Sequence, residues 1–183
     1  MITTLSFDLD DTLWDPRPAL IAADKAQWLA LAQRYPDLTD RFTRDQIFVC
    51  RKQILTDAPS IVSDVTALRI EVMYRLLLSL NIAPAEADES AKMAFEAFMA
   101  KRNDVTLFPE AIPLLESVSK SYTVVAITNG NADVFKTKIG PYFDLSIRAD
   151  ESRHSKTGQG YFRPDMGKTR LPIKRRYPYR RQC

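Results

Sequence analysis

Two β-strand signals in this chain are separated by a long stretch in which only helical periodicity is present. Residues 2–7 form an apolar run that ends at Asp8, and residues 122–128 form a β-branched run that is followed by Asn129-Gly130. Between these runs, in residues 16–102, apolar side chains recur at helical spacing. We therefore expect an α/β fold whose parallel sheet is interrupted, directly after its first strand, by an all-helical insertion.

Four helices are predicted within the insertion. The start of each of the last three carries a capping or helix-opening residue: Thr43 with Gln46 as a capping box, Ser63, and Pro84. After the insertion, we expect a helix over 109–120, a short helix over 132–138 and a strand over 145–148. The predicted organisation is a core of residues 1–15 and 103–156, an insertion of residues 16–102, and a tail of residues 157–183.

Composition indicates an ordinary globular protein. With 45% hydrophobic and 27% charged residues and no long apolar run, the sequence predicts no membrane partner. No signal peptide is visible, and two cysteines are too few for a disulfide framework, so a cytoplasmic monomer or weak dimer is expected.

The net charge of +3 is unevenly distributed. Residues 157–183 carry eight basic residues against one acid, a net charge of +7, which leaves residues 1–156 at −4. A basic tail usually indicates nucleic acid or an anionic membrane. The acidic body contains no recognised nucleic-acid-binding motif, so we do not expect a nucleic-acid partner.

The main chemical signal is Phe7-Asp8-Leu9-Asp10-Asp11-Thr12-Leu13 at the end of the first strand. Ligands of parallel α/β sheets bind beyond the carboxyl ends of the strands. Alternation along the strand lets Asp8 and Asp10 face a common centre while Leu9 points away. Paired carboxylates repel each other unless a cation lies between them, and hard oxygen ligands suit Mg²⁺.

This string resembles the nucleophile motif of the haloacid dehalogenase superfamily, an apolar strand followed by D-x-D-x-T-L. Two further motifs of that family are matched in order: Val124 to Thr128 with Asn129, and Lys156 downstream. The resemblance implies a Rossmann-like core with a helical cap inserted after the first strand. It also implies a magnesium-dependent phosphatase for small phosphorylated substrates.

The resemblance assigns a role to each matched residue. Asp8 would be the nucleophile and Asp10 the general acid and base, and both would serve the metal, Asp10 through its main-chain carbonyl. Thr128 and Asn129 would hold the phosphoryl oxygens, and Lys156 would offset their charge. Dehalogenase members of the superfamily lack the second aspartate, so Asp10 favours phosphate ester hydrolysis.

A closer resemblance is to the enterobacterial flavin-pathway phosphatases of this superfamily, whose substrates include FMN and a ribitylaminopyrimidine phosphate. It rests on four segments: Asp15 to Pro18, Asp64 to Thr66, Val125 to Ala132, and Arg148 to Asp150. Trp14 would either stack on an aromatic substrate or pack at the hinge of the cap. A catalytically inactive relative with the same fold is the main alternative, because the family's late metal-binding acid is absent as the sequence is written.

That absence leads to a prediction about the gene. After Lys156 the family continues with proline, an Ile-Phe pair, a helix and His-x-Gly-Asp, none of which is present, so the last part of the core is missing. Reading the codons of residues 157–183 one base later permits each of these, with the aspartate 25 positions after Lys156. Deleting one base after the Lys156 codon should restore Gly-Asp near that point, which the nucleotide sequence will decide. An early stop codon in that frame would refute the idea.

Overall fold

The computed structural model describes residues 2–36, 38 and 42–149, and every structural statement below concerns these residues. Its centre is a three-stranded sheet in the order β1-β4-β5. The strands are β1 (Thr4–Phe7), β4 (Thr123–Thr128) and β5 (Leu145–Arg148), and both pairs are parallel. The predicted parallel α/β sheet is therefore confirmed.

The register brings the carboxyl ends of the three strands to one edge of the sheet. Phe7 pairs with Ala126 and Thr128 pairs with Arg148, so the residues that follow β1 and β4 emerge side by side. In parallel sheets this edge is where ligands bind.

The insertion leaves and re-enters the core through a two-stranded antiparallel ribbon. Strand β2 (Trp14–Asp15) pairs with β3 (Thr106–Leu107), and the Phe108 amide donates to the Leu13 carbonyl at 3.0 Å. Both connections to the insertion are thus held together at one place.

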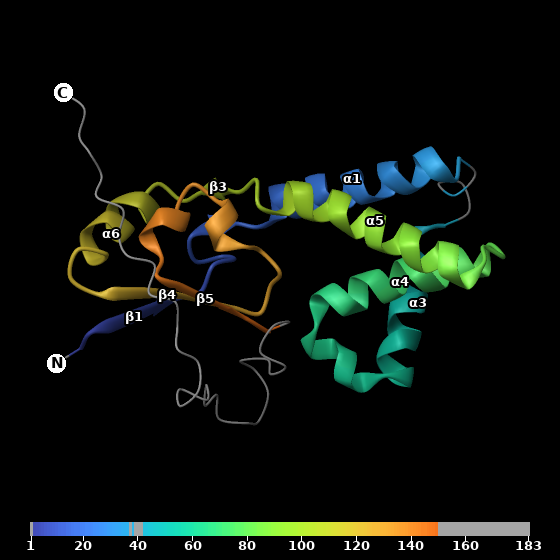
Figure 1. Ribbon diagram of the computed structural model, residues 1–183, viewed down its shortest axis with the longest axis horizontal. Helices are drawn as coiled ribbons and strands as arrows, with labels where there is room; N and C mark the ends of the chain where they lie inside the picture. Colours follow the sequence, from blue (N-terminus) through green and yellow to red (C-terminus); the bar gives the residue numbers. More distant parts are fainter. Residues whose placement is uncertain (1, 37, 39–41, 150–183) are drawn as a thin grey trace.

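Four long helices of the insertion lie to one side of the sheet (Figure 1). They are α1 (Arg17–Arg34), α3 (Arg44–Asp57), α4 (Val65–Ser79) and α5 (Pro84–Arg102). Helix α1 runs away from the core and α5 returns beside it, with α3 and α4 packed below them in that view (Figure 1). The core contributes α6 (Ala111–Val118), and three short 3₁₀ segments complete the described chain: η1 (Pro59–Ser63), η2 (Val134–Lys136) and η3 (Gly140–Tyr142).

The apolar side chains form two separate cores. One packs against the sheet and contains Leu9, Trp14, Leu115 and Val124, all fully buried. The other lies among the helices of the insertion and is built from residues of α1, α3, α4 and α5. The core and the insertion therefore each bury their own apolar side chains. Residues that face each other between these two parts belong to neither apolar core and can form a functional site.

The helix starts agree with the sequence in part. The Thr43–Gln46 capping box is present at α3, with the Gln46 amide donating to Thr43 Oγ1. The expectation that Ser63 caps the third helix is wrong: Ser63 ends η1 and donates to the Ser60 carbonyl. Asp64 caps α4 instead, accepting from the Ala67 amide at 2.8 Å.

Two helical expectations in the core are also corrected. Pro109 and Glu110 form a turn, so α6 begins at Ala111 rather than at Pro109. The segment predicted as a short helix over 132–138 contains only the three-residue η2, which Asp133 caps through the Phe135 amide.

Cys50 is half-buried and packs against the core of the insertion. Burial raises the pKa of its thiol above the ordinary value. Within residues 2–36, 38 and 42–149, no helix has the length and apolarity that a bilayer crossing would require. Lys156 and the tail of residues 157–183 lie outside the described residues, so the reading-frame hypothesis stays a prediction.

Candidate active site

A tight turn follows β1 and separates its apolar side chains from its carboxylates. The Leu13 amide donates to the Leu9 carbonyl at 2.9 Å, and the Asp11 amide donates to the Trp14 carbonyl at 2.9 Å. Asp11 has a φ of 59°, a left-handed conformation that Asp tolerates better than most residues. Leu9, Leu13 and Trp14 are buried in the core, while Asp8 and Asp10 are half-buried.

Asp8 and Thr128 emerge from neighbouring strands at the same level. Because Phe7 pairs with Ala126, Asp8 continues β1 opposite Ile127, one residue before Thr128. Neighbouring strands lie about 4.8 Å apart. The predicted nucleophile and the predicted phosphoryl-binding hydroxyl are therefore neighbours at the carboxyl edge of the sheet.

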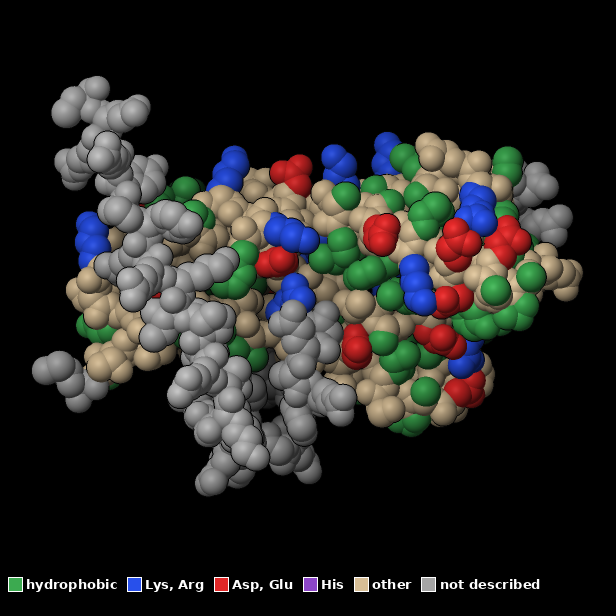
Figure 2. All heavy atoms as spheres, in the orientation of Figure 1, with side chains coloured by type: hydrophobic (Ala, Val, Ile, Leu, Met, Phe, Trp, Pro, Cys, Tyr) green, Lys and Arg blue, Asp and Glu red, His purple; other side chains and the backbone are tan. Residues whose placement is uncertain are grey.

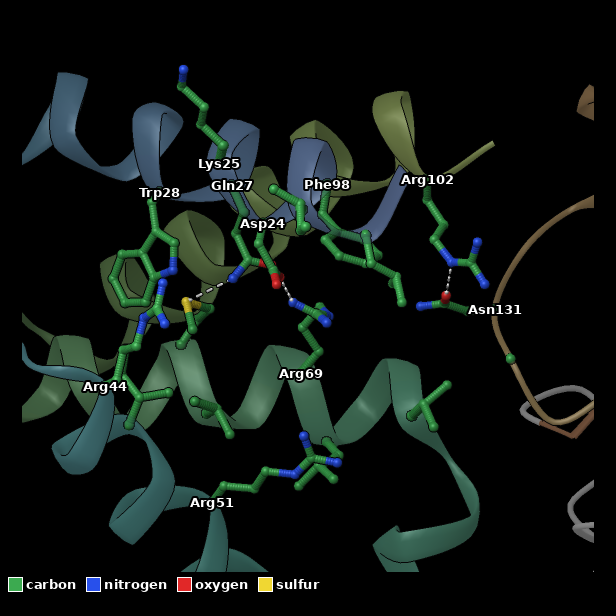
Figure 3. Close-up of a pocket in the computed structure, with 18 of the residues that line it drawn as sticks. Asp24, Lys25, Gln27, Trp28, Arg44, Arg51, Arg69, Phe98, Arg102 and Asn131 are labelled. Carbon is green, nitrogen blue, oxygen red and sulfur yellow. Dashed lines mark hydrogen bonds and ion pairs between the residues drawn. The ribbon is translucent and has the colours of Figure 1, made fainter. Parts of the chain in front are cut away.

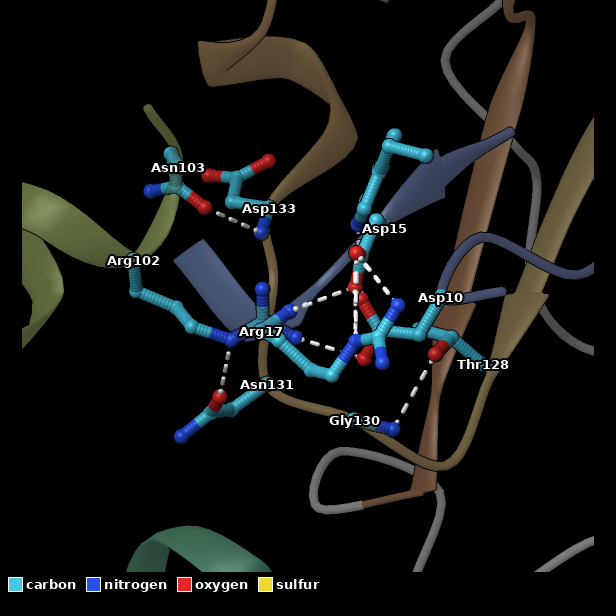
Figure 4. A network of polar contacts seen from close by, with 10 residues as sticks. Asp10, Asp15, Arg17, Arg102, Asn103, Thr128, Gly130, Asn131 and Asp133 are labelled. Atoms are coloured by element: carbon cyan, nitrogen blue, oxygen red, sulfur yellow. Dashed lines mark hydrogen bonds and ion pairs between the residues drawn. The ribbon is translucent and has the colours of Figure 1, made fainter. Parts of the chain in front are cut away.

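Asp10 is held by two hydrogen bonds, one to each carboxylate oxygen (Figure 4). Trp14 Nε1 donates to Oδ1 at 2.7 Å, and Arg102 Nη2 donates to Oδ2 at 2.6 Å. Each oxygen keeps a second lone pair, so Asp10 can still accept a proton or meet a substrate. Its side chain is 25% exposed, which gives it access to a ligand.

Two roles were expected for Trp14, stacking on an aromatic substrate or packing at the hinge of the cap, and its position decides between them. Its side chain is fully buried and its indole N–H is used by Asp10, so it does not stack on a substrate in this structure. Trp14 instead packs in the core at the start of the ribbon that joins core and insertion.

Gly130 allows the loop after β4 to approach Asp10. A Cβ atom at Gly130 would stand 2.8 Å from Asp10 Oδ2, closer than a carbon and an oxygen tolerate. The Gly130 amide donates to Thr128 Oγ1 at 3.0 Å, which leaves the Thr128 hydroxyl proton available as a donor. Thr128 itself is 3% exposed. Asp10, the loop at Gly130 and the Thr128 hydroxyl therefore lie close together in a largely buried part of the site.

Arg102 is a site residue that sequence reasoning missed. It is the last residue of α5, is only 1% exposed, and also donates from Nε to Asn131 Oδ1 at 3.2 Å. Next to it, Asn103 Oδ1 accepts from the Asp133 amide at 2.8 Å. The end of α5 is thus bonded both to Asp10 and to the loop after β4 (Figure 4). Lys and Arg at the end of a helix are ordinarily exposed to solvent, so nothing in the sequence indicated that Arg102 is buried at the site.

A cavity of about 750 Å³ extends from this site between the helices of the insertion. Asp10, Gly130 and Asn131 line its core end. Arg102 lies beside Asn131 there (Figure 3). Further in, Arg69 donates to Asp24 Oδ1 at 2.5 Å and lies 3.8 Å from the centre of the Phe98 ring. Burial lowers the pKa of Arg69, and the neighbouring Asp24 carboxylate opposes that shift.

The oxygen atoms at this edge fit a hard cation in chemical type. Asp8 supplies a carboxylate and Asp10 a main-chain carbonyl, which are donors that Mg²⁺ prefers. In the part of the chain that the structure describes, these residues belong to no group of three or more acidic, His or Cys ligands. Asn129 follows Thr128 at the same edge and is half-buried.

The Asp10–Arg102 contact leads to a stability prediction. Asp10→Ala leaves the buried Arg102 guanidinium without its carboxylate, which should lower the free energy of unfolding by about 2 kcal/mol. Asp15→Ala is the matched control, because its 2.7 Å ion pair with Arg17 is exposed and should contribute nothing measurable. Urea denaturation of both variants measures this. Equal, small effects would show that Arg102 does not depend on Asp10.

Comparison with known proteins adds two relatives. No model of a protein family matches the chain. The chain is 29% identical over 172 residues to the 5-amino-6-(5-phospho-D-ribitylamino)uracil phosphatase YigB of Escherichia coli strain K12, covering 94% of this chain and 72% of that protein. Because this alignment includes 172 of the 183 residues, it extends beyond Lys156 into the tail of residues 157–183.

The fold is similar to the crystal structure of a 2-haloacid dehalogenase from Pseudomonas syringae pv. Tomato DC3000. The two chains are 36% identical with a TM-score of 0.79, over 84% of this chain. The chain spans 66% of the length of that solved relative. Sequence identity and shared fold agree with the motifs at the carboxyl edge of the sheet: the chain belongs to the haloacid dehalogenase superfamily.

Proposed function

We propose that this protein hydrolyses a small phosphate monoester through an aspartyl-phosphate intermediate at Asp8. The observation that carries the proposal is the placement of a second carboxylate, Asp10, beside the Thr128–Gly130 loop at the end of β1. Phosphoryl transfer needs a nucleophile, a proton donor for the leaving group, and donors for the phosphoryl oxygens. Asp8, Asp10 and Thr128 provide these three functions in one place.

The first half-reaction would transfer the phosphoryl group to Asp8. A carboxylate oxygen of Asp8 attacks phosphorus, the bond from phosphorus to the ester oxygen breaks, and Asp10 gives a proton to the departing alkoxide. In the second half-reaction, water attacks the aspartyl phosphate and gives a proton to Asp10. The phosphorus–Asp8 bond breaks as water attacks, which releases inorganic phosphate, frees the Asp8 carboxylate and leaves Asp10 protonated for the next cycle.

Other residues would stabilise the charge on the phosphoryl group. The Thr128 hydroxyl and Asn129 would donate to its oxygens, and Lys156 would offset its charge, as the family resemblance implies. A Mg²⁺ ion held by Asp8 and the Asp10 carbonyl would supply further charge neutralisation. The enclosing helices would limit the access of water during transfer.

We propose FMN or a ribitylaminopyrimidine phosphate as the substrate. Support comes from the similarity to YigB, whose name states activity on 5-amino-6-(5-phospho-D-ribitylamino)uracil. The cavity between the helices of the insertion supplies space for a leaving group of that size.

Dehalogenation is the second candidate, because the similar Pseudomonas syringae structure is a 2-haloacid dehalogenase. Halide is released without a proton, so that reaction leaves Asp10 without a chemical task. The phosphatase reading uses both aspartates and is therefore preferred.

The tail-mediated nucleic-acid reading depends on residues 157–183, which lie outside the described residues, so it stays an untested alternative. Lys and Arg side chains are interspersed with Asp and Glu on the face that Figure 2 shows, without a basic stripe. Nucleic-acid-binding surfaces concentrate positive charge instead.

The nucleophile assignment predicts the effect of one conservative change. Asp8→Asn removes the attacking carboxylate and should reduce hydrolysis of p-nitrophenyl phosphate with Mg²⁺ at least ~1,000-fold. Asp11→Asn is the matched control, since Asp11 is exposed in the same turn and Asn accepts its positive φ. Both the chain as given and a version with the restored frame should be assayed. Substantial activity in Asp8→Asn would refute the mechanism.

A substrate panel separates the candidate reactions. FMN, sugar phosphates, nucleotides, phosphoglycolate and 2-chloropropionate are compared by kcat/KM, with phosphate or chloride release as the readout. FMN or a ribityl phosphate is expected to be preferred. Preference for phosphoglycolate would contradict the flavin-pathway assignment alone, whereas chloride release would contradict the phosphatase proposal itself.

A further inference from the structure

The cavity among the helices of the insertion is long, and two of its lining side chains, at separate places, each have a buried polar atom without a partner among the described residues. On α1, its lining extends from Leu20 to Trp28, a separation of eight residue steps that corresponds to about 12 Å of helix. Arg102 marks its end nearest the core, and Gln27 lies deeper among the helices (Figure 3). A leaving group that follows this cavity from Asp10 passes Gln27.

Gln27 is buried with half of its amide unpaired. Its side chain is 1% exposed, and Nε2 donates to Met73 Sδ at 3.2 Å. Oε1 is buried and has no hydrogen-bond partner among the described residues. Buried side-chain oxygens are normally paired, so an unpaired one that lines a cavity is available to a ligand group or to water.

Arg102 repeats this pattern at the other end of the cavity. Two of its nitrogens donate to Asp10 and Asn131, while Nη1 is buried without a partner in the described part of the chain. A guanidinium nitrogen can only donate, so this end requires an acceptor such as an ester or phosphoryl oxygen. The two unpaired atoms therefore lie where the two ends of one ligand would be.

The chemistry of an amide narrows the group that meets Gln27. Because Nε2 donates to Met73 Sδ, the unpaired atom of the amide is its oxygen, which is an acceptor. A neutral hydroxyl group can donate to this oxygen. Arg69 is already paired with Asp24, whereas Lys25, Arg44 and Arg51 also line the cavity. An anionic group would pair with these cations, and the neutral Gln27 amide suits a neutral hydroxyl instead.

We infer that Gln27 is a specificity-determining residue that binds a hydroxyl group of the substrate's leaving group. The favoured class is a phosphate ester of a polyhydroxylated chain. Its phosphate lies at Asp8, its ester oxygen lies near Arg102 Nη1, and its hydroxyls extend into the cap toward Gln27. This inference rests on the proposed phosphatase function and deepens it.

The test compares two phosphates that have the same five-carbon chain. Ribitol 5-phosphate carries hydroxyls along that chain and n-pentyl phosphate carries none. In the unaltered full chain, kcat/KM should favour ribitol 5-phosphate. Gln27→Met keeps the length of the side chain but cannot pair with a hydroxyl. It should lower kcat/KM for ribitol 5-phosphate by roughly 10- to 100-fold, and leave n-pentyl phosphate within about twofold.

Two further variants control for folding and position. Gln33→Met makes the same change on the exposed side of α1 and should alter neither substrate. If Gln27→Met fails to fold, Gln27→Asn keeps the amide but withdraws it by one methylene, and it should show the same selective loss. Thermal unfolding of each variant reports on folding.

Calorimetric binding of ribitol 5-phosphate separates failure of this inference from failure of the proposed function. Binding that weakens in Gln27→Met by a similar factor supports the inference even if no turnover is seen, in which case only the proposed function fails. An unchanged ratio of the two substrates in kinetics, or unchanged binding, would overturn it. That result would mean that solvent alone satisfies the Gln27 amide.

Discussion

The contact between Arg102 and Asp10 joins the two halves of this protein at the site. The guanidinium comes from the last residue of the insertion, and the carboxylate comes from the turn after the first strand of the core. Arg102 is 1% exposed, so its buried guanidinium needs hydrogen-bond acceptors at the place where the insertion contacts the core. Asp10 and Asn131 provide them, so the position of α5 and the position of the second aspartate depend on each other. Such a pair contributes more to a defined arrangement than to stability, since desolvation offsets much of its attraction.

The motif after β1 produces this arrangement through the alternation of its side chains. Leu9, Leu13 and Trp14 are buried in the core that packs against the sheet, which fixes the turn and directs Asp8 and Asp10 toward the carboxyl edge. Trp14 adds a hydrogen bond to Asp10 and begins the ribbon that leads into the insertion. One short segment therefore positions the nucleophile, orients the proposed general acid and starts the connection to the cap.

The sequence predicted the parts of the fold that depend on local patterns. Strand β5 has the predicted bounds, and the Thr43–Gln46 capping box is present, because alternation and capping are local properties. Ser63 was assigned as a cap wrongly because two adjacent residues, Ser63 and Asp64, both carry capping side chains, and only the path of η1 decides between them. Arg102 and Gln27 were missed for a different reason. Their burial follows from how the insertion packs on itself and on the core, and no neighbouring residue in the sequence signals that.

The account depends on a covalent phosphoryl group at Asp8. The most direct measurement is to mix the protein with p-nitrophenyl phosphate and Mg²⁺, quench with acid within the first turnover, and map phosphorylated peptides by mass spectrometry. The account predicts one hydroxylamine-sensitive phosphopeptide, modified at Asp8. Phosphate release without any modification of Asp8, or modification at another residue, would contradict it.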